Sequence, residues 1–247
     1  MIGPLVLTDL DDTLFQTLGK CPPDMGDGKI MTVLSDGAPS GYASERQIRL
    51  LSWLDQGLIV PVTARSREVL GRVIIRQSPA ICANGGCIIS GDGSIDAGWH
   101  DELKRQSLEL DPVREIHLRA TEGLDEATYR HWIVDEGELE LYFVIKANGT
   151  DLSVLDEAET RALKHTPQGW RIHRNGNNLA VLPPWLNKRN AAARLIETYR
   201  EADRHLPVIG IGDSHSDVGF MDLCDMAMTP TGSQVWNLLK KENAWCK

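Results

Sequence analysis

Four groups of polar residues, each set after a short apolar run, carry the side chains that could do chemistry in this chain. They are Asp9 with Asp11, Thr63, Lys188, and Asp213 with Asp217. Short apolar runs that end in polar residues and give way to helical patterns are typical of buried parallel strands. Open parallel sheets bind ligands at the carboxyl ends of their strands. We therefore expect the four groups to converge on one edge of a sheet.

The two acidic pairs predict both catalysis and metal binding. Asp9 and Asp11 lie where a strand ends, so both can approach one centre as the chain turns. One carboxylate could attack phosphorus as a nucleophile, and the other could donate and then accept a proton. An Asp-rich turn is the alternative for this pair. Asp213 and Asp217 add oxygen ligands, and a divalent cation such as Mg²⁺ is the simplest reason to gather so many carboxylates. Asp217 could instead cap the following helix, so Asp213 is the stronger metal candidate.

Two of the four polar groups, at Thr63 and at Lys188, are suited to binding phosphate. The hydroxyl of Thr63 and the backbone N–H of Ala64 stand at a strand end before a helix, where phosphate oxygens are readily bound, although a plain helix cap is the commoner use of Thr. Arg65 could add positive charge or lie in solvent. Lys188 begins a helix, where its charge opposes the helix dipole and suggests another task. Asn84 follows a third strand and could face the substrate, or form a turn.

The apolar runs and helix signals predict an α/β core with an interruption. We expect core strands near residues 4–9, 58–62, 81–83, 207–211 and 227–228. The capping box Ser44-Glu45-Arg46-Gln47 predicts one helix start, and further helices are expected from about Ser66, over 187–203 and from Asp217. The Gly/Pro-rich stretch 16–44, with a short strand at 30–34, is long enough to be a functional lid or flap, or else a disordered connection.

The middle of the chain has a different pattern, which predicts a second domain. Helices are expected near 111–121 and 153–165, and strands near 129–134, 139–146 and 170–174. The apolar run Leu179-Ala180-Val181-Leu182 is interpreted as the point where the chain returns to the α/β pattern of the core. The expected domains are a core at 1–86 and 177–247 and an inserted α+β cap at 87–176. The fold class is α/β: a doubly wound, mostly parallel, Rossmann-like sheet with this smaller insert.

Composition narrows the possible partners. The chain has 247 residues and a net charge of −9, which argues against a nucleic-acid or anionic-membrane partner. The N-terminus lacks the pattern of a signal peptide, and no apolar run reaches membrane-spanning length. The five cysteines, without Cys-x-x-Cys spacing, favour free thiols in a reducing cytoplasm. We expect a monomer or small homo-oligomer acting on a small phosphorylated molecule.

Taken together, the motifs resemble those of the haloacid dehalogenase superfamily of phosphohydrolases. The matching segments, in the family's order, are Asp9-Leu10-Asp11-Asp12-Thr13, Thr63, Lys188 and Gly212-Asp213-Ser214-His215-Ser216-Asp217. The insert resembles the α/β cap of the sugar-phosphatase branch, which includes sucrose-phosphate phosphatase. The resemblance implies that Asp9 is the nucleophile and Asp11 the acid and base. It also implies that Mg²⁺ is held by the carboxylates of Asp9 and Asp213 and the backbone oxygen of Asp11.

Two residues depart from the family pattern. Asp12 stands where many relatives carry Gly, and Ser216 stands where many carry Asn. Neither change removes a catalytic group, but Ser216 lacks the amide that usually supports the metal ligands.

The expected function is therefore a Mg²⁺-dependent phosphatase for a sugar phosphate or related polyol, acting through an aspartyl-phosphate intermediate. A phosphosugar mutase on the same fold would keep all four motifs, and a non-catalytic phospho-ligand binding protein is a further alternative. A signalling receiver domain is disfavoured by the second acidic pair and the insert. Several side chains of the insert could recognise the sugar: His131, Trp132, Trp170, Arg171, His173 and Arg174.

Overall fold

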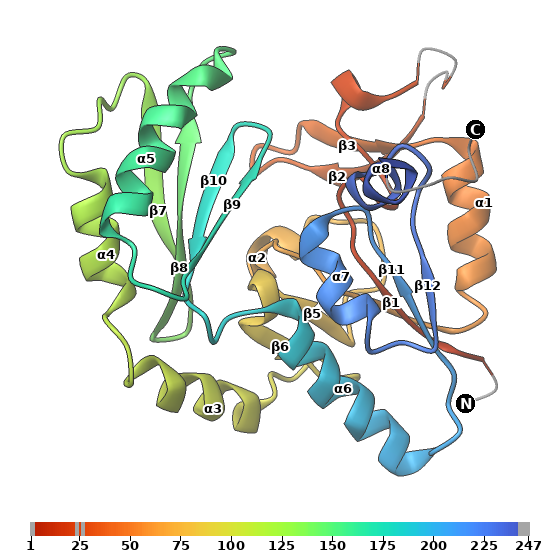
Figure 1. The fold of residues 1–247 in the computed structure, drawn as a ribbon. Coiled ribbons are helices and arrows are strands. Elements are labelled where there is room, and N and C mark those ends of the chain that lie inside the picture. The colour runs from red at the N-terminus through yellow and green to blue at the C-terminus, as the bar shows by residue number, and fades with distance from the viewer. Residues whose placement is uncertain (1–2, 23–24, 26–27, 242–247) are drawn as a thin grey trace. The chain divides into compact units, whose positions relative to one another are not determined.

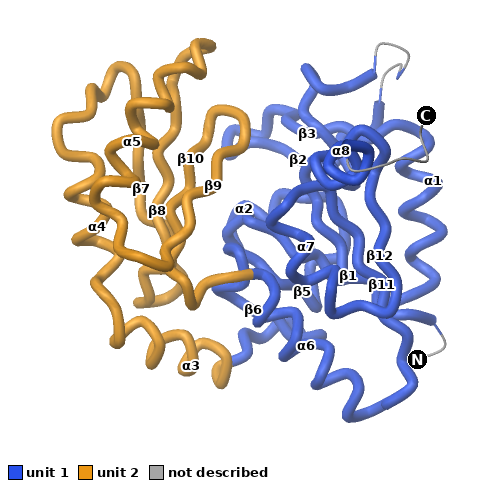
Figure 2. Tube along the Cα trace, viewed as in Figure 1, with its two compact units in different colours: residues 1–96, 188–247 blue, residues 97–187 orange. Residues whose placement is uncertain are grey.

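A four-stranded parallel sheet forms the centre of the first of two units in the chain (Figures 1 and 2). The computed structural model describes residues 3–22, 25 and 28–241, so Met1 and Cys246 lie outside the described residues. Unit 1 comprises Met1–Asp96 and Lys188–Lys247, and unit 2 comprises Ala97–Asn187. No helix among the described residues is long and apolar enough to cross a membrane.

The parallel sheet has the order β12-β11-β1-β4. Its strands are β12 (Met226–Met228), β11 (Val208–Ile211), β1 (Leu5–Thr8) and β4 (Leu58–Pro61). All four residues of β1 are buried, as expected for a central strand with both faces covered. Thr8 at its end is in register with Ile211 on one side and Pro61 on the other, so the three strands end at the same edge.

Helices of unit 1 begin largely where the sequence predicts. They are α1 (Glu45–Leu54), α2 (Arg67–Leu70), α6 (Lys188–Ala202), α7 (His215–Met221) and α8 (Gln234–Lys241). The capping box is confirmed, because Ser44 Oγ accepts from the backbone N–H of Gln47 and Gln47 Oε1 accepts from the backbone N–H of Ser44. The helix expected from Ser66 is shorter than predicted. It ends before Gly71, and the Ile74 amide then donates to Met31 O at 2.7 Å instead of continuing the helix.

Two hairpins complete unit 1. In the Gly/Pro-rich stretch, β2 (Lys29–Val33) pairs with β3 (Pro39–Ala43), a strand that sequence patterning missed because Pro and Gly disfavour strands. Gly41 is required there, since a Cβ atom would lie 2.5 Å from Thr32 Cγ2. The second hairpin pairs β5 (Ala80–Cys82) with β6 (Cys87–Ile89), and a parallel bridge from Val62 to Ile81 joins it to the strand-end region of β4.

Unit 2 is an antiparallel sheet with helices packed on one face (Figure 1). The strand order is β7 (Tyr129–Glu136), β8 (Leu139–Ala147), β10 (Asn178–Leu182) and β9 (Arg171–Asn175). Helices α4 (Val113–Thr121) and α5 (Leu155–His165) pack their apolar stripes against it, and α3 (Ala97–Ser107) precedes them. This core includes Ile116, Phe143, Ile145, Leu179 and Val181.

The boundaries of the units differ from the expected domain limits by about ten residues. Residues 87–96 belong to unit 1, because β6 pairs with β5. Residues 177–187 belong to unit 2, because β10 pairs with β8 and β9 rather than with the parallel sheet. The interpretation of Leu179–Leu182 as a return to the core was therefore wrong. An apolar run alone does not identify the sheet that it joins.

Candidate active site

The carboxyl edge of the parallel sheet brings together residues that are up to 208 positions apart in the sequence. Asp9 follows β1 and its amide donates to Ile211 O at 2.8 Å, which fixes it beside the end of β11. Asp213 comes two residues after β11, and Thr63 comes two residues after β4. The expected convergence of the strand ends is thus a consequence of register, since all three strands run in the same direction and end together.

Three carboxylates meet at this edge. One oxygen from each of Asp9, Asp213 and Asp217 lies within 4.8 Å of the others, and all three side chains are buried. Thr13 supports the group, because its Oγ1 lies 3.3 Å from both Asp9 Oδ2 and Asp213 Oδ1. Sequence reasoning quoted Thr13 as part of the first motif but gave it no role. Its position four residues after Asp9, on the turn that leaves β1, was the available signal.

Lys188 supplies the positive charge of the cluster. Its Nζ atom lies 2.7 Å from Asp9 Oδ1 and 2.7 Å from Asp217 Oδ1, and the residue is only 5 % exposed. Lys188 is the first residue of α6, where its charge is unfavourable for the helix dipole. The ion pairs with Asp9 and Asp217 explain why a lysine stands at this unfavourable position.

Asp217 serves the helix and the cluster at once. Its Oδ2 atom accepts from Ser214 N at 3.0 Å, Ser214 Oγ at 2.7 Å and Asp213 N at 3.3 Å, so it satisfies backbone donors at the start of α7. Its Oδ1 atom accepts from Lys188. The sequence posed these roles as alternatives, but a carboxylate has two oxygens and can perform both.

Burial and mutual repulsion determine the protonation behaviour of the cluster. Burial, together with the negative charge of Asp217, raises the pKa of Asp9 to about 8 despite the opposing effect of Lys188. The same two causes raise the pKa of Asp213 to about 6. For Lys188, burial favours the neutral form, but the ion pairs with Asp9 and Asp217 outweigh it and raise the pKa. For Asp217, burial is likewise outweighed by Lys188, and its pKa is lowered.

These carboxylates fit a hard divalent cation. One ammonium group cannot neutralise three carboxylates, and burial, with the charge of Asp217 as a smaller cause, raises the pKa of both Asp9 and Asp213. The donor atoms that meet here are all oxygens, the ligands that Mg²⁺ prefers. The side chain of Asp11 is not part of this group, and a metal contact from its backbone oxygen stays a prediction.

Asp11 is instead paired with Arg65. Arg65 Nε and one terminal nitrogen each donate to a different oxygen of Asp11 at 2.7 Å, in a two-pronged ion pair that joins the loops after β1 and β4. The Arg65 side chain also lies over the ring of Phe15 and donates to Thr32 Oγ1 at 3.3 Å, so β2 helps to hold it. Two parallel hydrogen bonds of this kind fix the relative geometry of the two side chains well. Sequence reasoning placed Arg65 near phosphate but did not foresee its contact with Asp11.

The remaining predicted substrate-binding residues lie on neighbouring loops. Thr63 is buried, and its Oγ1 accepts from the Arg65 amide at 3.1 Å, while Ala64 is exposed. The backbone of Asn84 has φ 58° and its amide donates to Thr63 O at 3.0 Å, which brings the turn after β5 beside Thr63. Roles for these three residues in binding a substrate are taken up below as proposals.

The two departures from the family pattern have local explanations. Asp12 has φ 61°, a left-handed conformation that favours Gly but that Asp tolerates, and its carboxylate pairs with Lys20. Ser216 Oγ lies 2.8 Å from Ser214 Oγ, the hydroxyl that donates to Asp217. Ser216 therefore supports the cluster through a hydroxyl contact in place of an amide.

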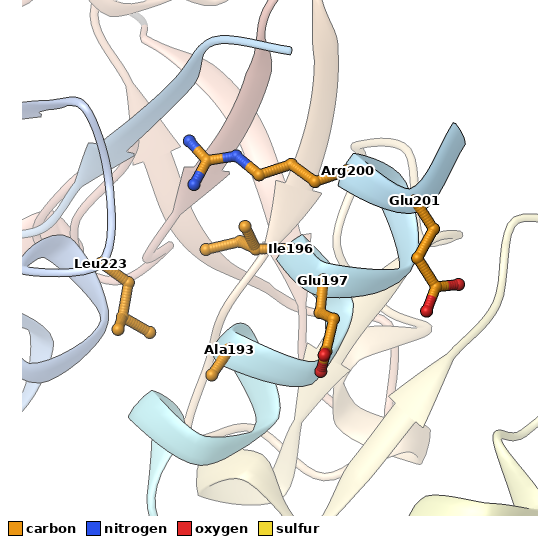
Figure 3. Close-up of a pocket in the computed structure, with 6 residues that line it drawn as sticks. All are labelled: Ala193, Ile196, Glu197, Arg200, Glu201 and Leu223. Atoms are coloured by element: carbon orange, nitrogen blue, oxygen red, sulfur yellow. The ribbon is translucent and has the colours of Figure 1, made fainter. Parts of the chain in front are cut away.

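A hollow of about 530 Å³ lies elsewhere on unit 1, along α6 (Figure 3). Its lining residues are Ala193, Ile196, Glu197, Arg200, Glu201 and Leu223. Arg200 is held by Asp225, 2.9 Å away, and no member of the acidic cluster lines the hollow. The acidic cluster at the sheet edge is therefore identified by its residues and their charges, and it does not coincide with this hollow.

Solved structures identify the fold. The sucrose-phosphatase from Synechocystis sp. PCC6803, in complex with sucrose and phosphate, matches with a TM-score of 0.57 and 20 % identity, over 100 % of this chain and 90 % of that one. The C-terminal domain of C. albicans trehalose-6-phosphate phosphatase matches with a TM-score of 0.55 and 15 % identity, over 89 % and 73 % of the two chains. No family model and no curated protein sequence matches the chain. The predicted α/β fold with an inserted cap is confirmed, and so, at the level of the fold, is the resemblance to haloacid dehalogenase phosphatases.

Proposed function

We propose that this protein is a Mg²⁺-dependent phosphomonoester hydrolase that acts on a small phosphorylated metabolite. The substrate class that we propose is a sugar phosphate. The observation that carries the proposal is the buried pairing of Asp9 with Lys188 at 2.7 Å, inside a cluster of three carboxylates at the carboxyl edge of the sheet. Its fold is shared with phosphatases, one of which was solved with sucrose and phosphate bound. That likeness supports the sugar class without identifying the sugar.

Asp9 is proposed as the nucleophile. One of its carboxylate oxygens attacks phosphorus, and the bond from phosphorus to the ester oxygen breaks, leaving an aspartyl phosphate and an alkoxide. Lys188 holds Asp9 Oδ1 and stabilises the ionised form that attack requires. The hydroxyl of Thr63 and the backbone of Ala64 are proposed to bind the phosphoryl oxygens, and Asn84 to line the substrate side.

Asp11 is proposed as the acid and base. It protonates the departing alkoxide, then accepts a proton from the water that attacks phosphorus and releases Asp9. In the structure both Asp11 oxygens accept hydrogen bonds from Arg65, so both are engaged away from any substrate oxygen. The first proton transfer therefore requires an oxygen of Asp11 to leave Arg65. A bound phosphate dianion is a competing partner for the guanidinium, which gives Arg65 its proposed role in substrate binding.

Asp9, Asp213, Asp217 and the backbone oxygen of Asp11 are proposed to hold Mg²⁺. The cation, when bound, offsets the carboxylate charge and polarises the phosphoryl oxygens. Asp217 is the most heavily engaged of these carboxylates, because Oδ1 accepts from Lys188 and Oδ2 accepts from three donors at the start of α7. We therefore place it as a support for Asp213 and Lys188 as much as a direct ligand.

A release assay tests the proposal. The protein is incubated with Mg²⁺ and a panel of phosphorylated sugars, polyols and an aryl phosphate, and inorganic phosphate is measured. We expect release without any bisphosphate activator. Isomerisation of a sugar phosphate that depends on such an activator would identify a mutase, and binding without turnover of any substrate would identify a binding protein. A cytoplasmic location is also proposed, on the cysteine content alone.

A further inference from the structure

The guanidinium group of Arg65 makes a third contact besides its two hydrogen bonds to Asp11. Its Nε and Nη2 atoms donate to the Asp11 carboxylate, and its Nη1 atom donates to Oγ1 of Thr32 at 3.3 Å. Thr32 belongs to β2, so this contact joins the loop after β4 to the β2–β3 hairpin within unit 1. The nitrogen that Thr32 binds is the one that Asp11 does not use.

The side chain of Thr32 is held in place by the strands around it. Thr32 is only 1 % exposed, and it is in register with Gly41 on one side and forms an isolated bridge with Val73 on the other. A Cβ atom on Gly41 would lie 2.5 Å from Thr32 Cγ2, so the Thr32 methyl group packs closely against the Gly41 backbone. Because the methyl group and the hydroxyl share one rotatable bond, the packing of the first fixes the direction of the second.

Arg65 is also anchored at its backbone and on the face of its guanidinium group. Its amide N–H donates to Thr63 Oγ1 at 3.1 Å, and its carbonyl oxygen accepts from the Ala83 amide at 2.7 Å. The guanidinium carbon lies over the ring of Phe15, 5.5 Å from the ring centre, where an aromatic face attracts a cation. Thr32 therefore completes a seat that holds the guanidinium beside Thr63, the residue proposed to bind phosphoryl oxygens.

This seat allows a phosphate to replace Asp11 on a guanidinium group that stays where it is. The Nε and Nη2 atoms form one edge of the planar group, and such an edge binds either a carboxylate or a phosphate through two parallel hydrogen bonds. The Asp11 side chain is 46 % exposed, so it has room to turn away from this edge. Nη1 lies outside the edge, so its hydrogen bond to Thr32 does not depend on which anion the edge holds.

We propose that Thr32 is a positioning residue for phosphate binding: its hydroxyl keeps the Arg65 guanidinium at the site while the edge that held Asp11 binds the phosphate of the substrate. The inference rests on the proposed phosphatase function and adds a residue of the β2–β3 hairpin to it. Without the hydroxyl, the guanidinium would turn about its side-chain bonds and follow Asp11. Thr32 thus acts on phosphate through Arg65.

Binding of inorganic phosphate to the full-length protein tests the proposal. Isothermal titration in Mg²⁺ measures the dissociation constant of phosphate for the wild type, Thr32→Val and Thr32→Ser. Valine keeps the shape of threonine but lacks the hydroxyl, so we expect phosphate to bind about fivefold more weakly, the effect of losing one hydrogen bond. Serine keeps the hydroxyl and should bind phosphate as the wild type does.

A double-mutant cycle determines whether Thr32 acts through Arg65. Arg65→Ala alone should weaken phosphate binding about tenfold. Adding Thr32→Val to it should then cause no further loss, because the hydroxyl no longer has the guanidinium as its partner. The proposal is overturned if Thr32→Val weakens binding equally with and without Arg65, if Thr32→Val binds phosphate like the wild type, or if Thr32→Ser loses as much affinity as Thr32→Val. An absence of phosphate binding by the wild type overturns it as well.

Thr121→Val is the matched control, because Thr121 is also buried and its hydroxyl donates to the His117 carbonyl oxygen at 2.8 Å within unit 2. It should leave phosphate affinity unchanged, and circular dichroism checks that each variant is folded. An equal loss of affinity in Thr121→Val would show a general effect of removing a buried hydroxyl and would overturn the proposal. The phosphatase proposal fails on a separate result, the absence of phosphate release by the wild type from any phosphomonoester.

Discussion

Replacing Lys188 with Met should destabilise the protein strongly in the absence of a divalent cation. The substitution keeps much of the side-chain volume but removes the ammonium group, which lies 2.7 Å from Asp9 and 2.7 Å from Asp217 at a position only 5 % exposed. Breaking a buried ion pair by removing one partner costs about 3–5 kcal/mol, because the other charge stays buried without compensation. For a chain of this size that cost lowers the thermal midpoint by roughly 6–20 °C.

Thermal unfolding followed by circular dichroism at pH 7.5 measures this loss in EDTA and again in Mg²⁺. The cation should raise the midpoint of Lys188→Met more than that of the wild type, because the variant has the larger deficit of positive charge. Lys20→Met is the matched control. Lys20 also pairs with an aspartate, Asp12, but its side chain is 52 % exposed, so its loss should cost less than about 1 kcal/mol. Equal midpoints for Lys188→Met and the wild type in EDTA would refute this view of the cluster.

Three further results are expected. Chelation should abolish phosphate release and Mg²⁺ should restore it, whereas full activity after exhaustive chelation would exclude the proposed metal; phosphate release before and after EDTA treatment measures this. Arg65→Ala should weaken inhibition by inorganic phosphate about tenfold, since a charged hydrogen-bond donor to phosphate is lost and Asp11 is freed; an unchanged inhibition constant would remove Arg65 from phosphate binding. Burial, with His131 and Arg114, lowers the pKa of His117, so the unfolded chain binds more protons below the ordinary pKa of about 6.5 and acid favours unfolding. The thermal midpoint should therefore fall more between pH 7.5 and 5.5 in the wild type than in His117→Gln, and equal falls would contradict this.

The parallel core could be predicted because its signals are local. Buried strands such as β1 are continuous apolar runs, and the capping box at Ser44 specifies a helix start within four residues. Parallel strands then bring their polar carboxyl ends together, so the convergence of Asp9 and Asp213 followed from strand direction alone.

Features that depend on long-range pairing could not be predicted in the same way. The assignment of β10 to the sheet of unit 2 depends on its partners β8 and β9, which its own apolar pattern does not reveal. Likewise, the ion pair of Arg65 with Asp11 joins loops 54 residues apart, and neither residue type indicates its partner. Among the insert candidates, His131 and Trp132 are neighbours in one strand and therefore lie on opposite faces, but which of the two faces the helices cover depends on packing that the sequence does not reveal.

The central claim, that Asp9 is the nucleophile of a phosphatase, is tested most directly by comparing phosphate release from the phosphomonoester panel by the wild type and Asp9→Asn. The amide is nearly the same size as the carboxylate but is a poor nucleophile, so the variant should remain folded by circular dichroism. We predict Mg²⁺-dependent release by the wild type and a loss of at least about a thousandfold in the variant, on the order of 4 kcal/mol in the barrier. Comparable release by the folded variant, or no release by the wild type from any phosphomonoester, would contradict the claim.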